Sequence, residues 1–309
     1  MIEACGLTKR YGSRLAVDDL NFTVRPGMVT GFLGPNGAGK STTMRLILGL
    51  DRPTAGTVTV DGRTHRRAAS PMHEVGALLD ARAVHGGRSA RSHLLCLAQT
   101  NGIAARRVDE VLGIVGLSDV ARKRSKGFSL GMSQRLGVAA ALLGDPQVLM
   151  FDEPVNGLDP EGILWIRTLM RSLAAEGRVV FVSSHLMSEM ESTADHLIVV
   201  GKGRLVADCS MAEFIARGSG TAVVVETPAP EVLARAVTAA GGSVTSEGSE
   251  GSEAWRLRVH GLSEAEVGAV AFAAGVPLHH LAAARVSLEQ AFMELTADSV
   301  EYHAALPVA

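Results

Sequence analysis

A glycine-rich segment with a single lysine is the part of the sequence whose residue types predict chemistry most directly. The pattern G-x-x-x-x-G-K-[ST] is matched by Gly34, Pro35, Asn36, Gly37, Ala38, Gly39, Lys40, Ser41 and Thr42. Glycines let backbone N–H groups wrap closely around phosphate, and a following helix presents its positive N-terminal end. Lys40 is expected to reach the β- and γ-phosphates, and the Ser41 hydroxyl to hold Mg²⁺. The pattern predicts nucleotide binding, but it is shared by kinases, GTPases and motor ATPases.

Two acidic residues follow directly on a second apolar segment, Val148–Phe151. An apolar strand would bring Asp152 to the edge of a sheet, where its carboxylate can bind Mg²⁺ through water. Glu153 is then the candidate general base that polarises the attacking water. An ordinary acid pair at a strand end is the alternative, which the phosphate-binding pattern upstream makes less favoured. We therefore predict that both segments bind one Mg·nucleotide.

The segments after this acid pair resemble those of the ATP-binding cassette (ABC) ATPases. Pro154, Asn156–Pro160 and Ser183–His185 are similar in order and spacing to the Walker B, D-loop and H-loop series of that family. The resemblance implies that ATP is the nucleotide and that His185 contacts its γ-phosphate as a second catalytic residue. It also implies that Asp159 communicates between the two subunits of a dimer. It covers about residues 2–217.

The segment Phe128–Arg135 resembles the ABC signature, which is usually written L-S-G-G-Q. The resemblance implies that Ser129, Leu130, Gly131 and Met132 face the ATP of the opposite subunit. Leu130 stands where glycine is usual, and Met132 where glutamine is usual. Because an apolar helix follows, N–H groups around Gly131 could bind phosphate at the start of that helix. A similar form of the signature occurs in the branch that exports drugs and antibiotics.

Two further positions have more than one interpretation. Thr8–Gly12 resembles the A-loop, which implies that Tyr11 stacks on adenine, whereas packing on a β region is the alternative. The family usually has a glutamine after a strand that corresponds here to Glu74–Leu79, but this chain has Asp80. Hard cations favour oxygen ligands, so Asp80 is a candidate Mg²⁺ ligand or a residue that couples to a membrane partner.

Strands and helices that alternate along the first two thirds of the chain must position these residues. The expected buried strands are Val29–Leu33, Gln147–Phe151 and Val179–Ser183, and the expected helices are Ser41 to about Leu50, Leu136–Leu143 and Glu161–Glu176. This alternation predicts an α/β fold with a mainly parallel sheet that is covered on both faces. Alternating residues over Leu15–Val24 and β-branched Thr57–Val60 predict an antiparallel β subdomain. The resemblance implies the P-loop NTPase fold of ABC ATPases, with a helical subdomain over about residues 85–140.

A change of composition after Arg217 divides the chain into two predicted domains. Residues 1–218 are expected to form the ATP-binding domain, and residues 219–309 a small α+β domain. The expected elements of the second domain are strands at 221–226 and 255–259, helices at 231–240, 263–274 and 287–295, and a polar loop at 245–253. Its sequence indicates no chemistry, and regulation, dimerisation and docking are all open roles.

The composition excludes several other classes of protein. The formal net charge is −2, so there is no basic field of the kind that attracts nucleic acid. Cys5, Cys96 and Cys209 have no disulfide or zinc spacing, which is typical of a reducing cytosol. No signal peptide and no run of roughly 20 apolar residues is present. We interpret the basic stretches 63–67 and 122–126 as solvated faces, and the histidines at 260, 279, 280 and 303 as non-functional.

The resemblance implies the ATP-hydrolysing subunit of an ABC transporter, at the cytoplasmic face of the membrane. Two copies would enclose two ATP molecules, each between the phosphate loop of one copy and the signature of the other. A separate integral membrane permease of the ABC-2 type is the expected partner, because Ser287–Leu295 resembles the ends of ATPase subunits that serve exporters of antibiotics, lipids or polysaccharides. The alternatives are a soluble ABC ATPase that acts on ribosomes or DNA, and a regulator that binds ATP but barely hydrolyses it.

Overall fold

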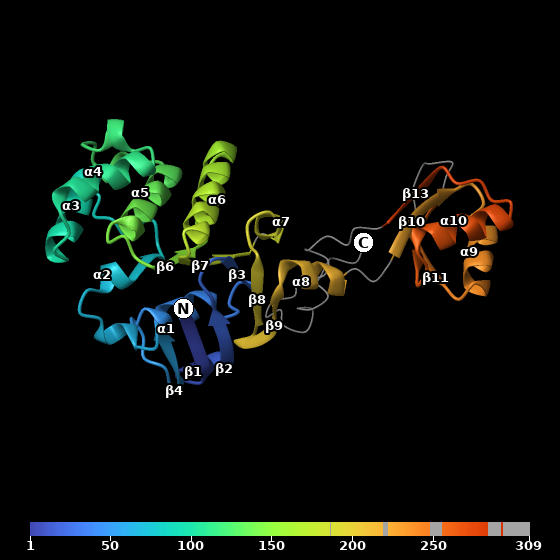
Figure 1. The fold of residues 1–309 in the computed structure, drawn as a ribbon, viewed down its shortest axis with the longest axis horizontal. Coiled ribbons are helices and arrows are strands. Elements are labelled where there is room, and N and C mark those ends of the chain that lie inside the picture. The colour runs from blue at the N-terminus through green and yellow to red at the C-terminus, as the bar shows by residue number, and fades with distance from the viewer. Residues whose placement is uncertain (186, 219–221, 248–254, 284–291, 293–309) are drawn as a thin grey trace. The chain divides into compact units, whose positions relative to one another are not determined.

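The computed structural model describes residues 1–185, 187–218, 222–247, 255–283 and residue 292 of the 309-residue chain. These residues form two compact units, which divide between Met211 and Ala212 and are described separately (Figure 1). The domain boundary after residue 218 stays a prediction.

A sheet of six described strands forms the centre of the first unit, in the order β5-β6-β7-β3-β8-β9. The strands are β3 Val29–Leu33, β5 Val75–Leu78, β6 Val148–Asp152, β7 Val179–Ser184, β8 His196–Gly201 and β9 Arg204–Ser210. All neighbouring pairs are parallel except β8 and β9, which are antiparallel. Most residues of β3, β6 and β7 are apolar and buried, as expected for strands covered on both faces. Since these three strands are parallel neighbours, their carboxyl ends meet at one edge of the sheet.

A second, antiparallel sheet has the order β2-β1-β4, with β1 Ile2–Tyr11, β2 Arg14–Val24 and β4 Ala55–Val60. The helix α1 Lys40–Ile47 contacts strands of both sheets. Phe22 of β2 packs with Phe32 of β3 and Phe181 of β7, with ring centroids 6.0 and 6.1 Å away. One hydrophobic core therefore joins the two sheets and fixes the strand that carries Tyr11 relative to the central sheet.

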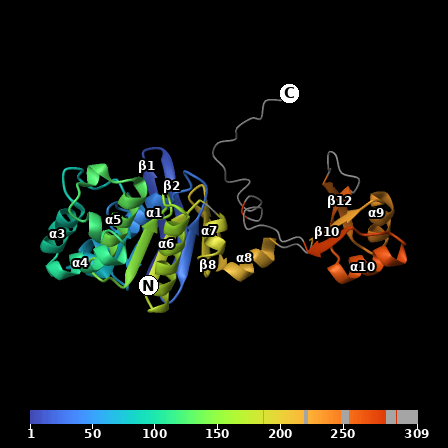
Figure 2. The same cartoon turned by 90° about the horizontal axis from the view of Figure 1, so that it is seen from above.

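The remaining helices of the first unit cover the central sheet or extend from it. They are α2 Pro71–Glu74, α3 Ala90–Thr100, α4 Ala105–Ile114, α5 Leu130–Leu142, α6 Pro160–Ala175 and α7 Met187–Glu191, with α8 Met211–Gly218 at the boundary between the units. Short 3-10 helices occur at His65–Arg67, Ser118–Val120 and Ser125–Gly127. α3, α4 and α5 gather in one group, in the range of the predicted helical subdomain (Figure 1). α6 contacts β7 and β3 and lies along the sheet (Figure 2).

Gly76 on β5 lies directly against the backbone of α5. A Cβ atom added at Gly76 would be 1.9 Å from the carbonyl oxygen of Ala141, far inside van der Waals contact. We expect Gly76→Ala to lower the free energy of unfolding by about 2–3 kcal/mol, because strand and helix must move apart in a packed core. Denaturant unfolding followed by circular dichroism measures this change.

Gly113→Ala on α4 is the matched control for that substitution. The nearest atom to a Cβ at Gly113, apart from its own helix, is Ser118 Oγ at 3.9 Å. Alanine is favoured over glycine within a helix by about 1 kcal/mol, so this variant should be at least as stable as the wild type. If both variants lost the same amount of unfolding free energy, this result would contradict the close approach of β5 and α5.

The second unit is a four-stranded antiparallel sheet with two described helices against it. Its strands are β10 Ala222–Thr227, β11 Ser243–Glu247, β12 Trp255–His260 and β13 His280–Ala283, in the order β11-β12-β10-β13, and its helices are α9 Pro230–Ala239 and α10 Glu264–Ala273. Buried residues of both helices and of the sheet form a separate core. The predicted α+β character is therefore confirmed for these residues.

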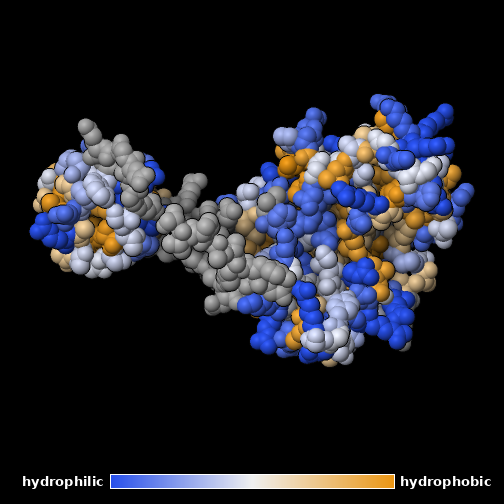
Figure 3. Space-filling view, turned by 180° about the vertical axis from the view of Figure 1, so that it is seen from behind, coloured by the Kyte–Doolittle hydropathy of each residue, from blue (hydrophilic) through white to orange (hydrophobic). Residues whose placement is uncertain are grey.

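Hydrophobic residues on the face drawn in Figure 3 are interspersed with hydrophilic ones. Within the described part of the chain, no helix combines the length and the apolar character needed to cross a bilayer.

Several expected elements differ from those observed. The polar run 245–253 was expected to be a loop, but its first residues belong to β11, where backbone pairing with β12 outweighs weak strand propensity. The helix expected from Leu136 begins at Leu130, because the Ser129 side chain accepts a hydrogen bond from the Met132 N–H and caps it. β1, β8 and β9 were not expected. The helix expected at 287–295 falls outside the described residues, except for residue 292.

The basic stretch at residues 63–67 is not a uniformly solvated face. His65 is buried, and its Nδ1 lies 3.8 Å from Glu74 Oε2. Burial lowers the pKa of His65, while Glu74 acts in the opposite direction. By contrast, the four basic side chains at 122, 123, 124 and 126 are exposed, as expected.

Candidate functional site

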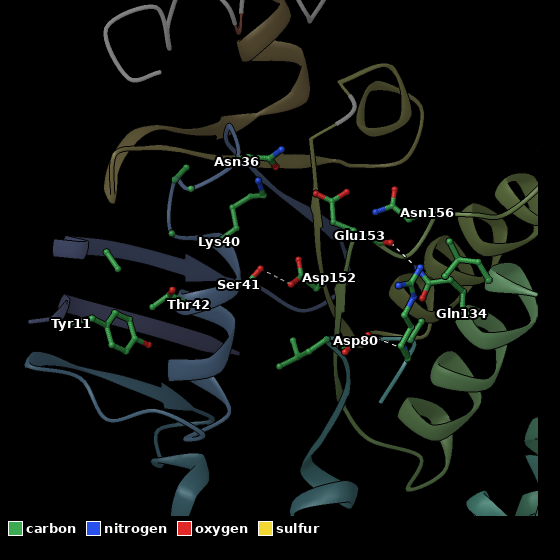
Figure 4. A pocket seen from close by; sticks show the side chains of 18 of the residues that line it. Tyr11, Asn36, Lys40, Ser41, Thr42, Asp80, Gln134, Asp152, Glu153 and Asn156 are labelled. Atoms are coloured by element: carbon green, nitrogen blue, oxygen red, sulfur yellow. Dashed lines mark hydrogen bonds between the residues drawn. The ribbon is translucent and has the colours of Figure 1, made fainter. Parts of the chain in front are cut away.

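A cavity of about 750 Å³ at the carboxyl edge of the central sheet brings together many of the predicted site residues (Figure 4). Those that line it are Tyr11, Asn36, Gly37, Ala38, Gly39, Lys40, Ser41, Thr42, Asp80, Leu130, Asp152 and Glu153. Its volume is within the range of about 300–1,000 Å³ that is usual for small-molecule sites. Residues far apart in sequence therefore share one ligand-sized cavity.

The glycine-rich loop connects β3 to α1, as the sequence predicts. Gly39 is the N-cap of α1 with φ 102°, a left-handed conformation that favours glycine. A Cβ at Gly39 would also lie 2.4 Å from the carbonyl oxygen of Ala16. A Cβ at Gly34, where the loop begins, would lie 2.4 Å from the carbonyl oxygen of Val200. The close course of the backbone around the cavity therefore requires both glycines.

Lys40 folds back over this loop. Its Nζ donates hydrogen bonds to the carbonyl oxygens of Gly34 at 2.6 Å and Pro35 at 3.3 Å. The side chain is buried, and burial lowers the pKa of Lys40, while the negative charges of Glu153 and Asp152 act in the opposite direction. A desolvated ammonium group beside the loop is a strong partner for an anion.

Asp152 ends β6 and connects two other elements of the site. Ser41 Oγ, at the start of α1, donates a hydrogen bond to Asp152 Oδ2 at 2.7 Å. Ser183 Oγ, on the neighbouring strand β7, donates to the other carboxylate oxygen, Oδ1. A hydroxyl and a carboxylate are hard oxygen ligands, so Ser41 and Asp152 fit the preferences of Mg²⁺. Ser183 was not predicted to act here, because only the parallel pairing of β6 and β7 brings it to Asp152.

Glu153 is held by contacts with three residues of other elements. Its φ of 51° is in the left-handed region, which is uncommon for a non-glycine residue. His185 Nδ1 lies 2.8 Å from Glu153 Oε2, and Gln134 Nε2 donates to the Glu153 carbonyl oxygen at 2.9 Å. The Glu153 N–H donates to the carbonyl oxygen of Ser183 at 3.2 Å. The turn after β6 therefore directs the carboxylate into the cavity that Lys40 also faces (Figure 4).

Gln134 and Glu189 are two further residues near Glu153 that the sequence did not single out. Gln134 is buried on α5 and lines the cavity. Glu189 is on α7, and burial, then the charge of Glu153, raise the pKa of its carboxyl group. Gln134 lies within the signature segment but was given no role of its own, and Glu189 belongs to none of the motifs, so only the folded chain indicates that both are near Glu153. Arg14, Arg82 and Asn156 also line the cavity.

The signature segment packs on the D-loop segment of the same chain. A Cβ at Gly131 would lie 2.9 Å from the carbonyl oxygen of Gly157, and one at Gly157 would lie 2.4 Å from Leu130. Ser129 caps α5, and Asp159 caps α6 by accepting a hydrogen bond from the Gly162 N–H at 3.0 Å. Leu130 lines the cavity, whereas the other four residues that were predicted to act toward a second copy do not: Ser129, Gly131, Met132 and Asp159. The roles of Ser129, Gly131, Met132 and Asp159 toward a second copy stay predictions.

Tyr11 and Asp80 lie at other parts of the cavity wall. The Tyr11 side chain is 45% exposed, so it is a surface of the cavity and not part of the core. Asp80 follows β5, and its Oδ1 accepts a hydrogen bond from the Arg82 N–H at 2.8 Å. The interpretation of Asp80 as a Mg²⁺ ligand or coupling residue stays a prediction.

Comparisons with known proteins agree with this arrangement. A family model described as ABC transporter matches residues 17–156, and a domain of unknown function (DUF8746) matches residues 221–289. The bacitracin transport ATP-binding protein BcrA of Bacillus licheniformis is 43% identical over 211 residues, 67% of this chain and 69% of that protein. The lantibiotic transport ATP-binding protein SrtF of Streptococcus pyogenes is 34% identical over 208 residues, 67% of this chain and 90% of that protein.

Solved structures have the same fold. An ATP-binding subunit of an ABC transporter matches with a TM-score of 0.64 and 25% identity, over 70% of this chain and 92% of that one. A dimeric ATP-binding cassette bound to ADP and Pi matches with a TM-score of 0.62 and 23% identity, over 68% of this chain and 99% of that one. The predicted α/β fold of the ABC ATPases is therefore confirmed. From its motifs, its fold and these relatives, the chain belongs to the family of ABC transporter ATP-binding proteins.

Proposed function

We propose that this protein hydrolyses Mg·ATP and thereby powers export through a separate membrane permease. One observation carries the ATPase proposal. Lys40, the Ser41–Asp152 pair and the Glu153 carboxylate, which His185 contacts, surround a single cavity. These groups are respectively a phosphate-binding cation, a set of Mg²⁺ ligands and a general base, which are the parts that phosphoryl transfer to water requires.

In this mechanism the protein mainly positions and stabilises charge. The loop of residues 34–42 binds the phosphates through backbone N–H groups, and Lys40 exchanges its contacts with loop carbonyls for phosphate oxygens. Ser41 and Asp152 would hold Mg²⁺, which neutralises charge on the phosphates. Glu153 orients the attacking water and accepts its proton, and the His185 N–H holds the Glu153 carboxylate in place.

A homodimer is part of the proposal. Ser129 and Gly131 are near the cavity of their own chain but do not line it, so a second copy is the proposed recipient of their N–H and hydroxyl groups. A turnover assay tests both hydrolysis and dimerisation. Phosphate release per chain from Mg·ATP should rise with protein concentration, because each half-site is incomplete alone. No phosphate release would contradict the ATPase, and a rate per chain that is independent of concentration down to the nanomolar range would contradict the dimer.

The names of the relatives support transport of a peptide antibiotic or a similar compound, and we propose that its direction is export. Bacitracin and lantibiotic transport are in the names of proteins 43% and 34% identical to this chain.

We propose an ABC-2-type permease as the partner and a peripheral position at the cytoplasmic face of the membrane. Purification of the tagged chain from detergent-solubilised membranes of its native cell tests this. An integral membrane protein should co-purify in stoichiometric amount, whereas recovery of the chain without one would contradict the partnership.

A further inference from the structure

Tyr11 is fixed at the end of β1 by a carboxylate that no sequence motif includes. The Tyr11 hydroxyl donates a hydrogen bond to Asp51 Oδ2 at 2.8 Å. Tyr11 also pairs with Arg14 at the turn between β1 and β2, so the backbone on either side of the ring is constrained. The phenol is therefore anchored at both ends, although the side chain is nearly half exposed to the cavity.

Asp51 itself is tied to the helix that carries the phosphate loop. Arg45, in the last turn of α1, donates from Nε to Asp51 Oδ2 at 2.8 Å and from Nη2 to Oδ1 at 3.5 Å. Arg45, then the Tyr11 hydroxyl, lower the pKa of Asp51, so the carboxylate is ionised at neutral pH and remains an acceptor for both. Because α1 begins at the phosphate loop, the contacts of Asp51 with Arg45 and Tyr11 hold the Tyr11 ring in place relative to that loop.

One face of the Tyr11 ring is already occupied. Lys9 Nζ lies over the ring, 4.7 Å from its centroid, in the geometry of a cation–π contact. The same ammonium group donates a hydrogen bond to the carbonyl oxygen of Arg52 at 2.7 Å, which holds it beside the residue that follows Asp51. A planar base that stacks on Tyr11 must therefore use the ring face opposite Lys9.

We propose that Asp51 is a positioning residue for nucleotide binding, which holds the Tyr11 ring so that adenine stacks on the face opposite Lys9. The proposal rests on the proposed binding of ATP at this cavity. Stacking depends on the angle and offset of two planes, so a ring free to turn about its side-chain bonds loses part of the contact. Asp51 supplies the restraint without touching the nucleotide.

The test is a double-mutant cycle on ATP affinity, measured by calorimetry with the full chain. Asp51→Ala should raise the Kd for ATP by about three- to tenfold, the effect of losing one hydrogen bond that orders the ring. Asp51→Asn keeps an acceptor oxygen and should bind nearly as well as the wild type. In a Tyr11→Phe background, Asp51→Ala should have no further effect, because the hydroxyl through which it acts is gone.

Binding of inorganic tripolyphosphate distinguishes a failure of this proposal from a failure of the proposed function. Tripolyphosphate contains no base, so the wild type and Asp51→Ala should bind it equally in the presence of Mg²⁺. Asp109→Ala is the matched control, since Asp109 on α4 also accepts two hydrogen bonds from one arginine, Arg91 on α3, and neither residue lines the cavity. Asp109→Ala should change neither the affinity for ATP nor the affinity for tripolyphosphate.

Three outcomes would overturn the role of Asp51. They are equal weakening of ATP and tripolyphosphate by Asp51→Ala, an undiminished effect of Asp51→Ala in the Tyr11→Phe background, and a crystal structure with adenine on the Lys9 face of the ring. A wild-type chain that binds neither ATP nor tripolyphosphate would instead refute the proposed function itself.

Discussion

Replacement of Glu153 by glutamine is expected to lower the rate of ATP hydrolysis by about 10²–10⁴-fold, the usual contribution of a general base. Glutamine has nearly the same shape, and it can still contact His185, which lies 2.8 Å from Glu153 Oε2. It cannot accept the proton of the attacking water. ATP should therefore bind to the variant with near wild-type affinity and remain uncleaved. Steady-state phosphate release and calorimetric binding of ATP measure the two effects separately.

Glu110→Gln is a control for the loss of one carboxylate at constant shape. Glu110 is exposed on α4, where its side chain pairs with Arg107 at 3.1 Å, and it does not line the cavity. This variant should hydrolyse ATP at the wild-type rate. If Glu153→Gln also did so, Glu153 would not be the general base, and the proposed ATPase mechanism would be wrong.

Replacement of Lys40 by methionine is expected to raise the Kd for ATP by at least about 100-fold, because two charge-assisted hydrogen bonds to phosphate are lost. Methionine keeps most of the apolar stem, so the packing of the buried side chain is largely preserved. The affinity for tripolyphosphate should fall in parallel, since Lys40 acts on phosphate and not on the base. Near wild-type retention and cleavage of ATP by this variant would contradict the site.

The same variant is expected to be at least as stable as the wild type when no nucleotide is bound. Burial lowers the pKa of Lys40, so the folded chain binds fewer protons than the unfolded chain between the lowered value and the ordinary one of 10.5. The free energy of unfolding should therefore rise with pH through that window. Below the window, the full cost of burying the charged ammonium group lowers the stability of the folded chain. Lys40→Met removes both this burial cost and the increase of stability with pH. Denaturant titrations of both proteins at pH 7 and pH 10 measure the two effects.

Lys123→Met is the control for that comparison, because Lys123 is exposed. Lys123→Met should leave the free energy of unfolding at pH 7 close to that of the wild type. A Lys40→Met variant that is clearly less stable than the wild type at pH 7 would show that the contacts of Lys40 with Gly34 and Pro35 outweigh its desolvation.

The elements that carry Lys40 and Asp152 at the cavity follow closely from local sequence. β3 was predicted with its observed bounds, and α1, β6 and α6 within a few residues. Their signals are local: unbroken apolar strands, glycines where the backbone must turn, and a helix that starts at a capping residue. Lys40, Ser41, Asp152 and Glu153 were identified because each follows one of these signals directly.

Other parts depend on pairing between distant segments, and local sequence does not report it. Four of the five residues of β11 are polar, and the strand forms through its ladder with β12. His65 lies in a basic stretch that looks solvated, yet it is buried beside Glu74. In each case, contacts with another segment of the chain determine a structure that the local composition does not predict.

By itself, the sequence determined the family, the α/β fold and the residues proposed to bind the phosphates, because that chemistry depends on residue types at short, regular spacing. Only the tertiary structure decided what holds those residues in position. Ser183 reaches Asp152 through the pairing of β6 with β7, Gln134 reaches Glu153 from α5, and Asp51 contacts Tyr11 from the segment that follows α1. Such contacts join residues whose separation along the chain carries no pattern, so only the packing of strands and helices brings them together.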